Sequence, residues 1–305
     1  MSTKLNDAAT RLYFIVARSA PVAVVFRRGP SRQVEVLRWD LTTDEVVPGQ
    51  WLKGRIYERR CDLSPSGDLL IYFAAKYETS LRTWTAISRL PYLTALALWP
   101  KSDAWGGGGL FDTERTVRLN HREQEMRLAD DFRLGPHMRA KPLGDRAGFG
   151  EDDPIHHHRL IRDGWTWVER GTRTRKEATK ARWLSFDPPE TYRREIGSGA
   201  STATLEMTIE GLMERDGPWY VTTYRLKRDD VVLRELGRAD WADRSPNSGD
   251  LLLARDGHLE RLAAPATPEG WARAEPKLVA DLDGHRFEAR EAPPQAVDWM
   301  IRRQS

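Results

Sequence analysis

The chain contains 305 residues, of which 40% are hydrophobic and 9% aromatic, and its 48 basic and 45 acidic side chains leave a formal charge of +3. This composition supplies enough apolar material for a packed core, which excludes a disordered, collagen-like or low-complexity chain. The near-balance of charges argues against a dedicated nucleic-acid-binding protein, because such a domain normally carries a strongly basic field.

Cysteine content and hydropathy bear on the compartment. Cys61 is the single cysteine, so an intramolecular disulfide and a cysteine-based zinc site are both excluded. The N-terminal apolar stretch is interrupted by Arg11 and Arg18 and shows no export signal, and the apolar run over residues 90–99 is too short for a membrane helix. We therefore expect a cytoplasmic protein without membrane contact, and the preference for arginine over lysine is typical of GC-rich bacterial genomes.

Short strands are predicted in chain order, because β-branched and aromatic residues gather between Gly, Pro, Ser and Asp boundaries. In the first half they cover residues 11–17, 22–27, 34–41, 69–75 and 83–89. A hairpin around Asp163-Gly164 is predicted over residues 159–170. Further strands cover residues 204–212, 219–226, 231–236, 250–254 and 258–262. So many short strands predict an all-β barrel, sandwich or propeller.

Two segments of the chain nearly repeat each other. Residues 62–72 read DLSPSGDLLIY, and residues 243–254 read DRSPNSGDLLLA. In both copies Ser-Pro favours a turn, Gly67 or Gly249 supplies a positive φ, and an apolar strand follows. A strand that is apolar on consecutive positions is typical of one covered on both faces.

This repeated element resembles that of β-propellers in which an S-P-x-G turn and an apolar strand recur once per blade, the WD-repeat-like and Tol-type propellers. The Trp39-Asp40 pair at the end of a predicted strand is also WD-like. The resemblance implies a propeller, and at roughly 40 to 50 residues per blade we expect about five blades.

The expected domain organisation is a single propeller-like domain over residues 1–305. Residues 101–154 are rich in glycine and charge and predict a long loop insertion, within which residues 114–134 fit either two outer strands or a short helix. A short C-terminal helix is predicted over residues 294–303, with proline at its start and arginines at its end. The alternative is a pair of β-sandwich or barrel domains divided near Pro154.

The most unusual candidate surface is a glycine run between two tryptophans. Residues 106–109 are consecutive glycines, which we interpret as a flexible loop tip where a backbone could approach a ligand closely. A phosphate-binding loop is not favoured, because no Lys-Ser/Thr follows. Tryptophan is enriched at interaction hot spots. The candidate ligand- or partner-binding residues are Trp99, Asp103, Trp105, Asp112 and Glu114.

Three consecutive histidines follow a run of carboxylates at residues 151–153. Imidazole and carboxylate groups can bind a divalent metal. If this segment is a strand, His156 and His158 point to the same face and could converge, whereas His157 points away. His156 and His158 are therefore weak metal candidates, and we identify no other cofactor.

A basic stretch over residues 169–182 is flanked by tryptophans. Basic side chains interleaved with aromatic ones are typical of single-stranded nucleic-acid binders. Arg173, Arg175 and Lys176 are the candidates for this contact, although the low net charge favours a solvated loop.

No pattern of catalytic residues emerges, because the chain lacks G-x-S-x-G and H-E-x-x-H motifs. We therefore expect a non-catalytic interaction or scaffold module that binds a protein or another ligand on a propeller face. The alternative is a hydrolase or lyase with its site at the propeller mouth, assisted by a divalent metal. Nucleic-acid binding is the third hypothesis.

Overall fold

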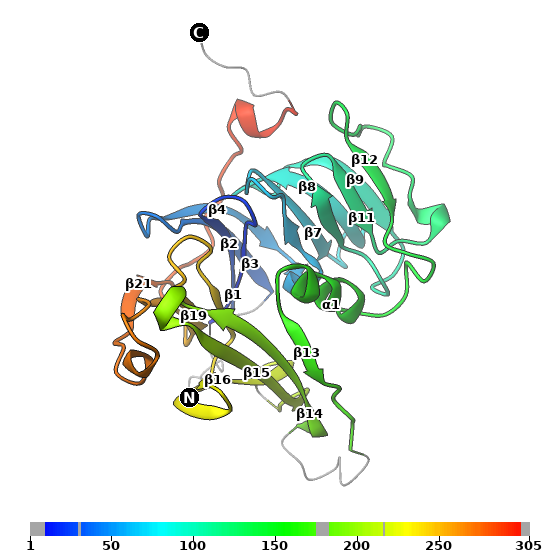
Figure 1. Cartoon of the computed structure of the whole chain (residues 1–305). Helices are drawn as coiled ribbons and strands as arrows, with labels where there is room; N and C mark the ends of the chain where they lie inside the picture. The colour runs from blue at the N-terminus through cyan, green and yellow to red at the C-terminus, as the bar shows by residue number, and fades with distance from the viewer. Residues whose placement is uncertain (1–9, 30–31, 175–182, 216, 300–305) are drawn as a thin grey trace, which may run out of the picture. The chain divides into compact units, whose positions relative to one another are not determined.

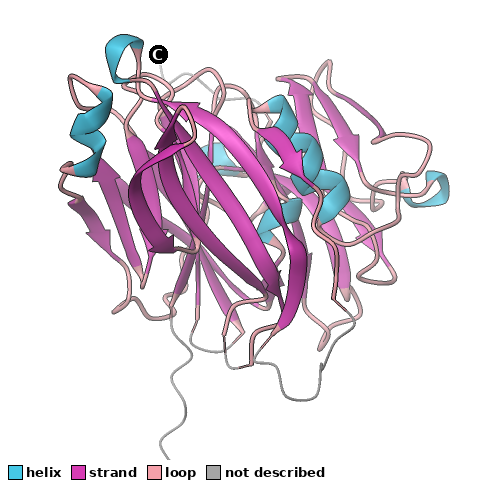
Figure 2. Ribbon diagram, turned by 60° about the horizontal axis from the view of Figure 1, so that its bottom comes forward, coloured by secondary structure: helices cyan, strands magenta, loops and turns pink. Residues whose placement is uncertain are grey.

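The computed structural model describes residues 10–29, 32–174, 183–215 and 217–299, and strands dominate it (Figure 2). Five β-sheets occur in these ranges, and each is built from strands that follow one another along the chain. The predicted all-β class is confirmed. No helix in the described ranges is long and apolar enough to span a membrane.

Two compact units divide the chain. Unit I comprises Tyr13–Arg159 and His285–Ser305, and unit II comprises Met1–Leu12 and Leu160–Gly284. The boundaries fall inside strand β1 (Arg11–Val16) and helix α1 (Asp153–Arg162). The expectation of a single domain, and its alternative of two domains divided near Pro154, both stay predictions.

Unit I carries the first three sheets. Sheet 1 has the order β1-β2-β3-β4, sheet 2 the order β5-β7-β8-β9 with β6 on β7, and sheet 3 the order β10-β11-β12 (Figure 1). After β1, the strands are β2 (Val22–Arg28), β3 (Gln33–Asp40), β4 (Val46–Lys53), β5 (Arg55–Ile56), β6 (Asp62–Leu63), β7 (Leu69–Ala75), β8 (Thr83–Arg89), β9 (Ala95–Lys101), β10 (Gly109–Thr113), β11 (Thr116–Leu119) and β12 (Arg139–Pro142). Short 3-10 turns are η1 (Glu58–Arg60), η2 (Glu123–Glu125) and η5 (Pro294–Ala296).

Unit II carries the remaining two sheets, in which the strands pair antiparallel in chain order. Sheet 4 contains β13 (Thr166–Glu169), β14 (Leu184–Ile196), β15 (Ala203–Leu212), β16 (Tyr220–Arg228) and β17 (Val231–Arg238). Sheet 5 contains β18 (Trp241–Arg244), β19 (Leu251–Arg255), β20 (His258–Leu262) and β21 (Lys277–Asp281). The 3-10 turns here are η3 (Gly199–Ser201) and η4 (Pro268–Ala272).

The core of unit I includes a cluster shared by sheets 2 and 3. It is formed by the fully or almost fully buried side chains of Ile71, Ile87, Ala97, Trp99, Phe111, Val117 and Leu119. Burying each large apolar side chain contributes about 1.5–3 kcal/mol, so this cluster holds the two sheets face to face. Strand β7 is buried on consecutive positions, as its apolar sequence predicts.

Both copies of the repeated segment form a turn with a positive-φ glycine, and the second turn is one residue longer than the first. The first links β6 to β7, and there Gly67 has a φ of 80° and donates its N–H to Ser64. The second links β18 to β19, and there Gly249 has a φ of 74° and donates its N–H to Ser245. Since only glycine adopts this conformation without strain, the predicted role of both glycines is confirmed.

The prediction of a hairpin around Asp163-Gly164 is wrong, because residues 153–162 form helix α1. The sequence begins the helix with an acidic residue and a proline, which suits a first turn. Gly164 ends it with a φ of 92°, and hydrogen bonds from Gly164 to Ile161 and from Trp165 to Leu160 close the C-terminus. This pair of bonds is a Schellman motif, so the Asp-Gly signal marks a helix end.

Two further expectations need correction. The predicted loop insertion over residues 101–154 contains the three strands of sheet 3, and the undecided residues 114–134 hold β11 and the turn η2. The predicted C-terminal helix over residues 294–303 is reduced to the 3-10 turn η5 within the described residues, while residues 300–303 lie outside them.

Candidate functional site

The glycine run of residues 106–109 is buried. Gly106 donates its N–H to the carbonyl oxygen of Gly150 at 2.8 Å, and Gly107 donates to that of Asn120 at 2.7 Å. Gly108 donates to a threonine hydroxyl at 2.8 Å. Because these N–H groups are used inside the protein, they are not available to an anion, and the interpretation as a flexible loop tip is wrong.

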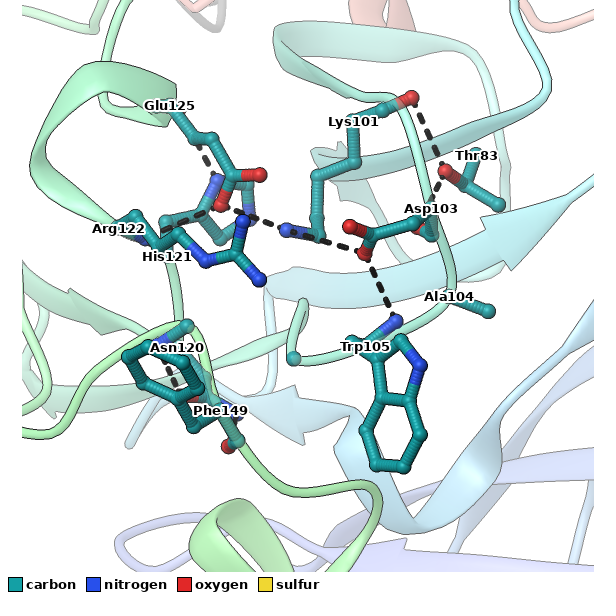
Figure 3. Close-up of polar contacts among 12 residues, drawn as sticks. Thr83, Lys101, Asp103, Ala104, Trp105, Asn120, His121, Arg122, Glu125 and Phe149 are labelled. Carbon is teal, nitrogen blue, oxygen red and sulfur yellow. Dashed lines mark hydrogen bonds and ion pairs between the residues drawn. The ribbon is translucent and has the colours of Figure 1, made fainter.

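A buried ion pair lies beside this run (Figure 3). The Lys101 side chain is fully buried, and its Nζ lies 2.6 Å from Oε2 of Glu125 and 3.9 Å from Oδ1 of Asp103. Burial acts to raise the pKa of Glu125, but the hydrogen bonds from Lys101 and from the Arg122 N–H outweigh it and lower that pKa. Glu125 therefore stays ionised, and its ion pair with Lys101 fixes the end of β9 to the turn η2.

His121 extends this polar cluster into the interior. Its Nε2 lies 2.7 Å from the Thr85 hydroxyl, and its Nδ1 lies 3.1 Å from the Glu125 carbonyl oxygen. A carbonyl only accepts, so the geometry assigns the proton to Nδ1 and leaves Nε2 to accept from the hydroxyl. Burial, together with the nearby Lys101 charge, lowers the pKa of His121 to about 4.

This lowered pKa predicts a loss of stability in acid. Between about pH 6.5 and pH 4 the unfolded chain binds a proton at His121 that the folded chain does not, so stability falls as the pH falls through this window. From pH 7.5 to pH 5, His121 is expected to account for a loss of about 2 kcal/mol in the free energy of unfolding.

Urea unfolding at both pH values measures this loss. His121→Gln should show a smaller acid loss than the wild type, because it removes the group whose pKa burial lowers. Buried His156 and partly buried His157, whose pKa values are also lowered by burial, add losses of the same sign to both proteins. An unchanged pH dependence in His121→Gln would contradict a neutral buried His121.

Trp105 is exposed, and its backbone is held by the polar cluster of Lys101, Asp103 and Glu125. Its backbone N–H donates to Oδ1 of Asp103 at 2.9 Å, while 58% of the residue is exposed. The indole ring points away from the ion pair of Lys101 and Glu125 (Figure 3). A large aromatic ring is thus presented to solvent by a backbone that the buried network holds in place.

Phe149 is a second exposed ring, carried by a neighbouring segment. Gly106, which follows Trp105, is hydrogen-bonded to Gly150, which follows Phe149, so the two segments lie side by side. Phe149 is 56% exposed, and the guanidinium carbon of Arg122 lies 5.1 Å from its ring centroid. We call Trp105, Phe149 and Arg122 the aromatic surface.

A depression of about 640 Å³ lies on the same polar cluster. Lys101 and Glu125 contribute to its lining together with residues 127–130. Because these two side chains also hold the backbone that leads to Trp105, the depression and the exposed indole share one rigid support.

The other residues of the predicted binding surface lie elsewhere. Trp99 is 1% exposed and belongs to the core between sheets 2 and 3, so it is not available to a ligand. Asp112 is ion-paired with Arg118 at 2.6 Å, and Glu114 accepts a hydrogen bond from the backbone of Ser66. The structure therefore brings together Asp103 and Trp105, whereas Asp112 and Glu114 stabilise other turns.

The weak metal candidates do not converge. His156 and His158 lie on α1, where side chains two positions apart point to different sides. His156 is buried, with Nδ1 3.4 Å from a guanidinium nitrogen of Arg59, whereas His158 is exposed and bonded to the Pro154 carbonyl oxygen. The assumption that this segment is a strand is wrong. Within the described ranges, no group of three His, Cys, Asp or Glu side chains is placed to hold a metal.

The nucleic-acid candidates are only partly described. Arg173 is exposed and forms an isolated β-bridge with Phe186. Arg175 and Lys176 lie outside the described residues.

Comparisons with known proteins assign neither a family nor a function. No protein-family model matches the chain, and no curated protein matches it. Among solved structures, the uncharacterized protein lmo1340 from Listeria monocytogenes EGD-e is similar over 94% of this chain and 87% of its own, with 10% sequence identity and a TM-score of 0.30. A likeness at this level carries no argument about fold or function.

Proposed function

We propose that this protein is a non-catalytic interaction module whose five sheets are the blades of a β-propeller. Two observations support the propeller. Each sheet is formed by consecutive strands, as blades are. The two related segments, with one residue more in the second, each form a turn that contains a positive-φ glycine and leads into an apolar strand, in sheets 2 and 5, as expected of an element that recurs between blades. The single cysteine suits a reducing compartment, which supports a cytoplasmic location.

The proposed contact site is the aromatic surface, and the observation that carries it is the exposure of Trp105 on a buried polar base. Trp and Arg are enriched among residues that dominate binding energy. A rigid anchor loses little conformational entropy when a partner binds. The partner we propose is a protein that places an apolar side chain against Trp105 and Phe149 and a carboxylate near Arg122.

Removing the two rings should abolish partner binding without unfolding the chain. Both side chains are more than half exposed, so Trp105→Ala combined with Phe149→Ala should change the free energy of unfolding by less than about 1 kcal/mol. The measurement is affinity capture from a cell extract, followed by direct binding of the recovered protein in purified form. The double variant should lose at least tenfold in affinity.

The matched control is Trp219→Ala, which removes a tryptophan that is 41% exposed in unit II. This variant should keep wild-type binding. If the wild type, the double variant and the control recover the same partner with equal affinity, the aromatic surface is not the contact site.

A further inference from the structure

A second concave site in unit I is lined by positive charge. A cavity of about 430 Å³ is bordered by Arg28, Arg32, Lys53, Arg55 and Lys76, with Glu78 as the single acidic side chain among the described residues of the lining. These residues come from the ends of strands in sheets 1 and 2. Five cations and one carboxylate leave an excess of four positive charges in a chain whose total charge is +3.

Most of these cations have no carboxylate partner. Arg28 lies 3.7 Å from Glu58, a long and partly exposed ion pair. Among the described residues, no carboxylate lies within 4.0 Å of the charged groups of Lys53, Arg55 or Lys76. Like charges gathered in a concavity repel one another and attract anions, so this cavity is electrostatically suited to a multiply charged anion.

Two of the cations are held in place by aromatic rings. The Arg55 guanidinium lies 4.4 Å from the centroid of Tyr57, and the Lys53 ammonium lies 4.2 Å from that of Phe287. Such contacts restrict the side chains without neutralising them. The charges are therefore positioned before a ligand arrives, which lowers the entropic cost of binding.

Tyrosines supply the remaining chemistry of the cavity. Tyr57 and Tyr77 both line it, and their hydroxyl oxygens lie 3.3 Å apart. Burial and this contact raise the pKa of Tyr57 to about 12, so its hydroxyl keeps its proton and adds no negative charge. Tyr77 is 54% exposed and offers a ring face to the uncharged part of a ligand.

We propose that this cavity binds a small molecule that carries two or more phosphate groups, such as a nucleoside polyphosphate. Guanidinium and ammonium groups are the side chains that recognise phosphate. The volume lies within the range of small-molecule sites, and the low net charge of the chain disfavours an extended nucleic acid. This site is separate from the aromatic surface, and none of the residues that line it belongs to that surface.

Isothermal titration of the full chain at low ionic strength tests the proposal with inorganic tripolyphosphate, ATP and adenosine. Tripolyphosphate and ATP should bind at one site per chain and compete with each other, whereas adenosine should not bind detectably. Lys53→Gln combined with Arg55→Gln should weaken both anions at least tenfold, because two positioned charges are lost. Both side chains are exposed, so the fold is expected to tolerate the change, and circular dichroism verifies this.

The matched control is Arg127→Gln combined with Lys141→Gln, which removes two exposed charges of unit I outside the cavity. It should leave both affinities within twofold of the wild type. The proposal would be overturned if tripolyphosphate did not bind, or if the control variant lost as much affinity as the Lys53→Gln, Arg55→Gln variant. Tenfold tighter binding of a 20-nucleotide oligothymidine at the same site would also overturn it, in favour of a nucleic acid.

Discussion

Gly107→Ala is expected to lower the free energy of unfolding by about 3 kcal/mol or more. A Cβ at this position would lie 2.3 Å from the ring of Phe73, which is itself fully buried. That ring cannot move aside easily, because it packs against Tyr57 with 5.2 Å between centroids. The φ of 84° adds strain for any residue with a side chain. Overpacking and a left-handed conformation each cost about 1–3 kcal/mol.

Chemical denaturation of Gly107→Ala and Gly144→Ala measures this loss. At Gly144 an added Cβ meets nothing within 4 Å and the φ is not positive, so the control should lie within about 0.5–1 kcal/mol of the wild type. Equal stability of the two variants would mean that the glycine run tolerates side chains and is not a packed support for Trp105.

Lys101→Met is expected to destabilise the protein by about 3 kcal/mol, because it leaves the carboxylate of Glu125 largely buried without its partner. The same change removes one of the contacts that hold Asp103, whose carboxylate in turn binds the backbone of Trp105. We therefore expect weaker partner binding as well as a lower free energy of unfolding.

A surface ion pair provides the comparison for this prediction. Arg127 and Asp130 lie 2.7 Å apart, but both side chains are more than 80% exposed, so Arg127→Met should change stability by no more than about 1 kcal/mol. Adding Glu125→Leu to Lys101→Met should recover part of the loss, since no unpaired charge is left buried. If Lys101→Met and Arg127→Met lower the free energy of unfolding by the same amount, the buried pair does not stabilise the fold.

Much of the strand content was predictable from the sequence, because buried strands need apolar residues on consecutive or alternate positions. The segments that became β2 and β7 carry consecutive apolar residues, and those that became β3 and β8 carry apolar residues largely on alternate positions. The long strand β14 escaped prediction because Asp187-Pro188-Pro189 interrupts it, and proline normally excludes a strand from a sheet interior.

Helix α1 was missed for a different physical reason. Its ten residues include three histidines and two arginines, so the sequence shows no apolar face. The buried face of the helix is formed by Ile155, His156, Arg159 and Leu160. The helical period appears only if His156 and Arg159 are counted as buried residues. Their burial depends on polar partners elsewhere in the chain, such as Arg59 for His156.

The candidate site was predicted only in part. Trp105 and Asp103 could be found because a tryptophan beside glycines and carboxylates is unusual, but the same signal selected Trp99, which is core. Phe149 lies 44 positions after Trp105, and only the folded chain brings their segments together. The basic cavity was missed because its cations are scattered over residues 28–76, and Lys53 and Arg55 lie in strands β4 and β5, which were not predicted.

The central claim is that the aromatic surface contacts a protein partner, and site-specific photocrosslinking tests it most directly. Phe149→p-benzoylphenylalanine places a reactive ketone on this surface, and Trp219→p-benzoylphenylalanine places the same group on an exposed position of unit II. We predict that irradiation in cells gives a discrete crosslinked protein from position 149, which disappears when Trp105→Ala is added, and none from position 219. No crosslink from position 149, or the same product from both positions, would contradict the account.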